Sequence, residues 1–228
     1  MNTVFYIIKS VFFTLFPRTC IFCNKILDVD EHRICKRCNK LYPYPVIDKP
    51  GVFFAPLYPY TSRICIMGRY TYIKKALLEF KFRENIAKGN ILGKMLSDKL
   101  MLTDWAKDID IIVPVPLHKK QLKKRTYNQC RIIADIIGKK LNKPVIEHNL
   151  YKVNITKNQH RIGYSSRLDN PENNYNVKNT ALFADKKILL VDDVITTCTT
   201  LTECCKALKQ CPNIEISICA LASNRRHI

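Results

Sequence analysis

Two adjacent acids, Asp192 and Asp193, end the apolar run "KKILLV" and precede a stretch of small polar residues. Ligands of parallel α/β sheets bind beyond the carboxyl ends of the strands, where the chain turns into a helix. Carboxylates at such a position accept hydrogen bonds from neutral hydroxyls, and the backbone amides of a helix N-terminus favour an anion. A ligand whose sugar hydroxyls bind the acids and whose phosphate binds the donors that follow is a ribose 5′-phosphate. The alternative is a surface helix that is merely capped by an acid. The predicted phosphate donors are consecutive: Thr196, Thr197, Cys198, Thr199 and Thr200.

Four cysteines form two C-x2-C pairs, Cys20/Cys23 and Cys35/Cys38, with eleven residues between the pairs. This spacing lets four thiolates converge on one tetrahedral ion about 2.3 Å away. A shell of four thiolates leaves no position for water, so the predicted zinc is structural and not catalytic. The chain has 11 cysteines in total, and this odd, uneven set fits a reducing compartment better than a disulfide framework. We therefore expect a zinc module in a cytoplasmic protein.

Basic residues outnumber acidic ones by 38 to 19, which gives a formal net charge of +19. The excess favours an anionic partner such as a phosphorylated metabolite or nucleic acid, and a compositional bias toward lysine is the alternative explanation. One basic cluster follows the apolar run "DIDIIVPVP" and another spans residues 33–40. With nearby tyrosines, these clusters offer phosphate contacts and stacking surfaces for single-stranded DNA. The candidates for binding a departing pyrophosphate or a DNA phosphate are Lys119, Lys120 and Arg125, and the tyrosines are Tyr42, Tyr44 and Tyr127.

Apolar runs and amphipathic segments alternate along the chain, which predicts an α/β fold with a parallel sheet and helices on both faces. Three prolines within 41–51 predict a linker, because proline lacks the amide donor that a strand or helix interior needs. The predicted domains are therefore residues 1–50, with an N-terminal helix and the zinc module, and residues 51–228. The expected strands are 52–60, 63–68, 108–118, 143–153, 182–194 and 214–223. The expected helices are a pair over 71–101 with a break near 88–90, an amphipathic helix with a basic entry within 119–141, and one after the acids.

The N-terminal run Val4–Cys20 is apolar but is interrupted by Lys9. It is shorter than the roughly 20 residues of a spanning helix, and no small-residue cleavage site follows it. Its apolar residues recur at helical spacing between Val4 and Leu15 and form one apolar face. We therefore expect no membrane span but a helix docked on the protein or on a partner, with membrane contact or a signal segment as the alternative.

The acids and the threonine-rich loop resemble the signature of the type I phosphoribosyltransferases, which use phosphoribosyl pyrophosphate (PRPP). The resemblance implies that Asp192 and Asp193 form the catalytic centre and hold the ribose 2′- and 3′-hydroxyls. It also implies that residues 196–200 hold the 5′-phosphate and that magnesium arrives with PRPP. Cys198 stands where this loop usually has glycine, the residue that adopts positive φ most easily.

Five segments, taken in order, resemble the ComF proteins: the four-cysteine module, "ALLEFKFRENIAKGNILG", "VPVPLHKKQLKKRTYNQ", "TKNQHRIGYSSRLDNPENNYNV" and the acid–threonine loop. This resemblance implies a phosphoribosyltransferase-like protein of natural competence with structural zinc. Its expected partners are PRPP, incoming single-stranded DNA in the cytoplasm and other competence proteins. Family members commonly read Arg-Gly-Phe-Asn-Gln over 125–129, so Thr126 stands in place of a second glycine.

Two other functions fit the same residues. A nucleobase-salvage phosphoribosyltransferase would release pyrophosphate, whereas a binding protein would show salt-dependent DNA affinity without turnover. A degenerate fold retained for protein contacts would bind neither PRPP nor DNA. Because no set of residues indicates an acceptor base, the DNA-uptake accessory protein is the preferred hypothesis.

Overall fold

A four-stranded parallel sheet lies at the centre of the computed structural model, with the strand order β1-β6-β5-β2. Its strands are rich in Ile, Leu and Val because a parallel sheet is buried on both faces. Successive residues of β5 therefore join different cores: Leu189 and Val191 pack on one face, and Ile188 and Leu190 on the other. The strands are β1 (Arg63–Arg69), β2 (Ile111–Pro114), β5 (Lys187–Ile195) and β6 (Glu215–Ser223). The structure describes residues 17–28, 30–41, 52–61, 63–83, 85–117, 122, 125–153 and 174–224.

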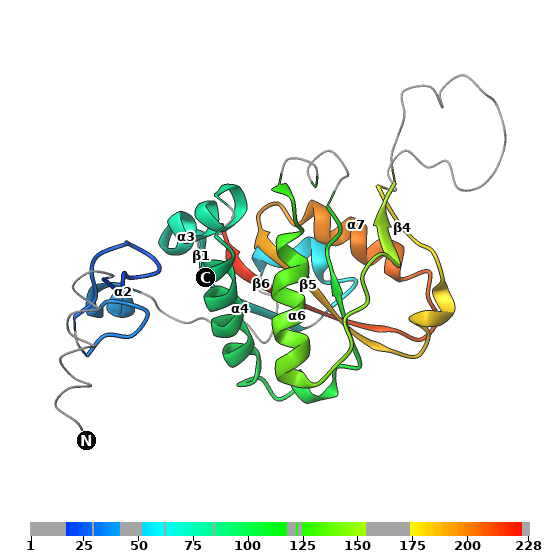
Figure 1. The fold of residues 1–228 in the computed structure, drawn as a ribbon. Coiled ribbons are helices and arrows are strands. Elements are labelled where there is room, and N and C mark those ends of the chain that lie inside the picture. The colour runs from blue at the N-terminus through cyan, green and yellow to red at the C-terminus, as the bar shows by residue number, and fades with distance from the viewer. Residues whose placement is uncertain are drawn as a thin grey trace.

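Helices cover both faces of the sheet, as Figure 1 shows. Three of them pack on the Leu189 face, where α4 and α6 lie side by side. The opposite face is covered by α7, by a 3-10 turn and by a small antiparallel hairpin. The first group is α3 (Tyr70–Phe82), α4 (Ile86–Leu100) and α6 (Gln129–Leu141); the second is α7 (Thr199–Leu208), η1 (Val52–Leu57), β3 (Leu150–Lys152) and β4 (Tyr175–Val177). The remaining short elements are α2 (Lys36–Leu41), η2 (Ala106–Asp108) and η4 (Thr180–Leu182).

The predicted α/β class and most of the predicted strands are confirmed, but two local predictions are wrong. Residues 52–57 form the 3-10 turn η1 and not a strand; this turn contains Pro56 and buries Phe54 and Leu57 in the core of the α7 face. The break between the paired helices falls at 83–85 and not at 88–90. Asn85 begins α4 by accepting a hydrogen bond from the Lys88 amide at 3.0 Å. Gly89 lies inside that helix, where the absence of a Cβ makes room for the Phe80 ring, which a Cβ would approach to 2.2 Å.

The cysteine-containing module, residues 17–41, packs against α3 and α4. Ile21 and Phe22 are buried in the same core cluster as residues of these helices. The Asn24 side chain donates to Glu79 at 3.1 Å and accepts from Lys88 at 2.7 Å. The predicted N-terminal helix and the predicted linker lie outside the described residues, so the division into two domains stays a prediction. Within the described part of the chain, no helix is long and apolar enough to cross a membrane.

Candidate functional site

The two acids lie near the carboxyl end of β5, and each is 8% exposed. The two carboxylates contact different helices. Asp193 pairs with Lys81 of α3, whereas Asp192 accepts a hydrogen bond from the Cys130 thiol of α6 at 3.6 Å. The Asp193 amide also donates to the Asp192 carboxylate at 2.8 Å. The predicted acid pair is therefore held at the end of the strand by α3 and α6.

Lys81 is a residue of this site that the sequence reasoning did not single out. Its ammonium lies 2.8 Å from the Asp193 Oδ1, and the side chains are 16% and 12% exposed, respectively. Lys81 precedes Asp193 by 112 residues, so only the tertiary structure brings the two together. The segment "EFKFREN" belongs to one of the stretches that resemble the ComF proteins, but no local spacing relates its lysine to an acid on a distant strand.

The environment of Asp192 favours its protonated form. Burial is the largest cause and the neighbouring Asp193 charge the second, and together they raise the pKa of the Asp192 carboxyl to about 7. Burial, reinforced by the two acids, likewise raises the pKa of the Cys130 thiol, which keeps its proton and donates a hydrogen bond to Asp192. Asp192 can thus both accept and, when protonated, donate a hydrogen bond near neutral pH.

The loop after the acids makes a left-handed turn just before α7. Cys198 is buried and has φ 68° and ψ −7°, a left-handed conformation, immediately before α7 begins at Thr199. Residues 196, 197, 199 and 200 are exposed, and the hydroxyls of Thr197 and Thr199 lie 2.9 Å apart. The first amides of a helix have no carbonyl partner within it, so the turn places potential donors beside threonine hydroxyls.

The stretch Arg125–Gln129 connects the end of β2 to α6. Asn128 begins α6 by accepting from the Cys130 amide at 3.0 Å and donates to the Val115 carbonyl at 3.1 Å. Thr126 has φ 60°, so this position, like Cys198, keeps a left-handed backbone without glycine. The Tyr127 hydroxyl donates to the Phe80 carbonyl. The stretch is thereby fixed to α3 and to the residue that follows β2.

Arg125 is the one predicted pyrophosphate candidate within the described residues, because Lys119 and Lys120 lie outside them. Its guanidinium donates to the Gln129 side chain at 3.2 Å and lies 5.0 Å from the centre of the Phe82 ring. Phe82 follows Lys81 directly and is 63% exposed. Arg125 therefore lies beside the helix end that supplies Lys81.

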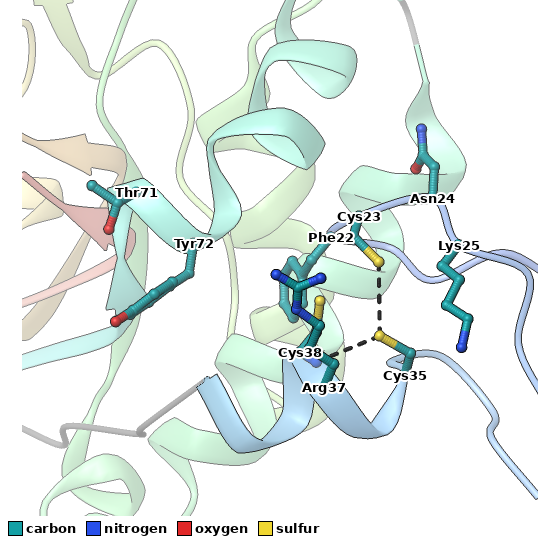
Figure 2. Close-up of a pocket in the computed structure, with 9 residues that line it drawn as sticks. All are labelled: Phe22, Cys23, Asn24, Lys25, Cys35, Arg37, Cys38, Thr71 and Tyr72. Carbon is teal, nitrogen blue, oxygen red and sulfur yellow. Dashed lines mark hydrogen bonds between the residues drawn. The ribbon is translucent and has the colours of Figure 1, made fainter.

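The four predicted metal ligands converge. The sulfur atoms of Cys20, Cys23, Cys35 and Cys38 all lie within 4.8 Å of one another, and the Cys23 and Cys35 sulfurs are 3.7 Å apart. Figure 2 shows three of the four ligands, Cys23, Cys35 and Cys38, close together. In a tetrahedron with metal–sulfur bonds of about 2.3 Å, the sulfurs are about 3.8 Å apart, so the cluster fits such an ion.

Backbone hydrogen bonds around the cluster also suit thiolate ligands. The Cys35 amide donates to the Cys20 sulfur and the Cys38 amide to the Cys35 sulfur, each at 3.4 Å. Burial raises the pKa of Cys20, but hydrogen bonds from neighbouring amides outweigh it and lower the pKa to about 7. A cavity of about 590 Å³ lies beside the cluster, between the module and the start of α3 at Thr71 and Tyr72.

The chain is similar to several known proteins. Residues 128–227 match the family described as the phosphoribosyl transferase domain. Competence protein F of Haemophilus influenzae is 27% identical over 221 residues, which are 89% of this chain and 96% of that protein. Competence protein ComFC of Bacillus subtilis is 28% identical over 135 residues, 58% of this chain and 52% of that protein. Among solved structures, an adenine phosphoribosyltransferase from Trypanosoma brucei matches with 12% identity and a TM-score of 0.40, over 82% of this chain and 78% of that one.

Proposed function

Because the chain belongs to the ComF family of competence-associated, phosphoribosyltransferase-like proteins, we propose that it binds PRPP at the end of β5 and uses this site while handling single-stranded DNA during uptake. The observation that carries the proposal is the buried pair Asp192 and Asp193, followed five residues after Asp193 by the left-handed Cys198 and then by the N-terminus of α7.

Each part of this site suits one part of PRPP. The two carboxylates accept hydrogen bonds from the ribose 2′- and 3′-hydroxyls, and Asp192 can donate one while it keeps its proton. The amides at the start of α7 and the hydroxyls of residues 196, 197, 199 and 200 hold the 5′-phosphate. Magnesium would arrive on the pyrophosphate, where it neutralises phosphate charge, so no separate protein cage is needed.

We propose structural zinc in the four-cysteine cluster and cytoplasmic action. Zinc suits four convergent thiolates, because it prefers tetrahedral sulfur ligands and is not reduced or oxidised. The cluster lies against α3, which carries Lys81, so the ion would support the helix that completes the site. An odd number of cysteines agrees with a reducing compartment.

Single-stranded DNA binding is supported by the net charge of +19 and by an exposed aromatic–arginine pair. Phe82 is largely exposed and Arg125 lies over its ring, and such pairs stack on bases without sequence preference. Tyr127 suits this role less well than expected, because its ring stacks on Phe80 at 5.8 Å and its hydroxyl is bonded to the backbone. Tyr42 and Tyr44 lie outside the described residues.

Calorimetric titration of Mg·PRPP into the zinc-loaded full chain tests the proposal. We expect saturable binding that the double variant Asp192→Asn/Asp193→Asn loses. Asp110→Asn is the matched control, because Asp110 accepts a hydrogen bond from the Lys187 amide at the opposite end of β5. Absence of binding by the natural protein would contradict the proposal.

A second assay distinguishes the proposed DNA-binding function from the alternative function, nucleobase salvage. Pyrophosphate release from PRPP in the presence of a panel of bases would support a salvage enzyme. Salt-dependent DNA affinity without release supports the binding protein.

A further inference from the structure

Lys81 places a positive charge inside the proposed sugar site. Its ammonium lies 2.8 Å from Asp193, with 16% of the lysine side chain and 12% of the aspartate side chain exposed. A buried charge is costly unless it is paired, so the two groups stabilise each other in this position. Lys81 comes from the last turn of α3 and therefore belongs neither to the threonine-rich loop nor to the basic cluster after β2.

The ammonium has donors to spare. Lysine carries three N–H groups, and Asp193 accepts from one of them. Within the described part of the chain, this is the one hydrogen bond that the Lys81 ammonium makes. Two N–H groups are therefore available to a ligand that enters beside Asp193.

The local charge balance points to an anionic group. Asp193 and Lys81 neutralise each other, and the pKa of Asp192 is raised so that it is partly protonated near pH 7. The pyrophosphate of PRPP is attached to the sugar carbon next to the one that carries the 2′-hydroxyl. Without the lysine, an acid that holds a ribose hydroxyl would therefore repel this pyrophosphate. With the lysine, the same position offers that pyrophosphate a cation and free donors.

We propose that Lys81 is a positioning residue that stays paired with Asp193 and donates a second hydrogen bond to the pyrophosphate of bound PRPP. The inference rests on the proposed PRPP binding, and it explains why the site would prefer PRPP to a ribose phosphate without pyrophosphate. A lysine suits this double role, because its ammonium is a compact charge whose donors point in several directions.

The chain provides a matched control in Lys88. Its ammonium pairs with Glu79 at 2.5 Å, and both side chains are 13% exposed. It also donates to Asn24 of the cysteine module at 2.7 Å and makes no contact with either acid of the site. Lys88→Met thus removes an equally buried ion pair outside the site.

The experiment compares two ligands that differ by the pyrophosphate. Mg·PRPP and, separately, ribose 5-phosphate with magnesium are titrated into the natural protein, Lys81→Met, Lys81→Arg and Lys88→Met. We expect Lys81→Met to bind PRPP about 10- to 100-fold more weakly, the worth of one charge-assisted hydrogen bond, and ribose 5-phosphate within about threefold of the natural protein. Lys81→Arg should retain most of the preference for PRPP, and Lys88→Met all of it.

Three results would overturn the inference or what it rests on. Equal weakening of both ligands in Lys81→Met would mean that Lys81 acts by holding Asp193 alone. Tighter PRPP binding in that variant would mean that the lysine blocks the site. If the natural protein binds neither ligand, the proposed PRPP function fails, a failure distinct from that of Lys81. Should Lys81→Met melt below the titration temperature, Lys81→Gln makes the same comparison, because it keeps a donor for Asp193 but lacks the charge.

Discussion

Cys198 and Thr126 share a left-handed backbone, with φ 68° and φ 60°, at the two positions where glycine is expected. Both turns thus keep the conformation that glycine favours, although each side chain carries a Cβ. A left-handed residue other than glycine costs roughly 1–2 kcal/mol, so the surrounding contacts must hold these turns in place.

Substituting Thr126 with glycine should stabilise the protein. Thr126 is exposed, so the substitution removes no buried surface. The relief of backbone strain in the folded state exceeds the cost of the extra conformational entropy that glycine gives the unfolded chain. We expect the free energy of unfolding, measured in urea, to rise by about 0.5–1 kcal/mol. Thr71→Gly, an exposed position in α3, should lower it by about 0.5 kcal/mol. A loss of stability in both variants would show that strain at Thr126 is negligible.

Substituting Cys198 with glycine should leave PRPP affinity within about threefold of the natural value. The backbone of the turn already has the conformation that glycine would adopt, so the phosphate donors stay in place. Stability should change little, because the relief of strain and the lost burial of the thiol, each about 1 kcal/mol, oppose each other. Titration of Mg·PRPP into both proteins measures the effect. If binding arises only in the glycine variant, the Cβ of Cys198 obstructs the phosphate site.

The contribution of Asp192 to the free energy of unfolding should fall as the pH rises from about 4 to about 7. The folded protein keeps the Asp192 proton up to a pKa of about 7, whereas an unfolded aspartate loses it near pH 4. The folded state therefore binds more protons in this window, which makes the slope of stability against pH negative. Asp192→Asn should flatten the slope, and its free energy of unfolding at pH 8 should exceed that of the natural protein by about 1–3 kcal/mol.

Urea unfolding of Asp192→Asn at several pH values between 4 and 8 provides the measurement. Asp110→Asn serves as the control, because its carboxylate accepts a backbone hydrogen bond at the other end of β5. An unchanged slope in Asp192→Asn would mean that Asp192 ionises normally in the folded protein.

Removal of the metal should unfold the cysteine module first. Four thiolates without an ion lose their common attractive centre, and the free energy of zinc binding is then missing from folding. We expect a strong chelator to lower the melting temperature and to expose the amides of residues 17–41 to hydrogen exchange. Cys38→Ser should lower the zinc content measured by mass spectrometry, whereas Cys211→Ser, a buried cysteine outside the cluster, should keep it. Full zinc content in Cys38→Ser would contradict the four-cysteine site.

Phe82→Ala should weaken single-stranded DNA binding by about 5- to 100-fold, the usual worth of one stacked base. Because Phe82 is 63% exposed, its loss should change stability little, and fluorescence anisotropy at several salt concentrations can isolate the effect on binding. Arg125→Ala should weaken binding and reduce the salt slope by about one phosphate. Leu102→Ala, a residue that is 80% exposed, is the control. Unchanged affinity in Phe82→Ala would place the DNA elsewhere.

The amino-acid sequence by itself determined the features that depend on short-range spacing. The two cysteine pairs converge as expected because two-residue spacers turn both thiolates of a pair toward one ion. The central strands follow from apolar runs that only a doubly covered parallel sheet can bury. The order of strand, loop and helix, with Asp192 and Asp193 near the end of the strand, is equally local, since these parts are contiguous in the sequence.

The tertiary structure alone decided the features that depend on contacts between distant segments. Lys81 reaches Asp193 only because α3 packs beside the end of β5, and no pattern within either segment records that contact. Gly89 lies inside a helix although glycine in isolation favours a break, and the Phe80 ring of another helix occupies the space that a Cβ would need. The left-handed backbone at Cys198 is likewise imposed by the packing of the turn against the core, since the intrinsic preference of cysteine opposes it. Local preferences of about 1 kcal/mol yield to burial and ion pairing, and for that reason the elements could be predicted but the completed site could not.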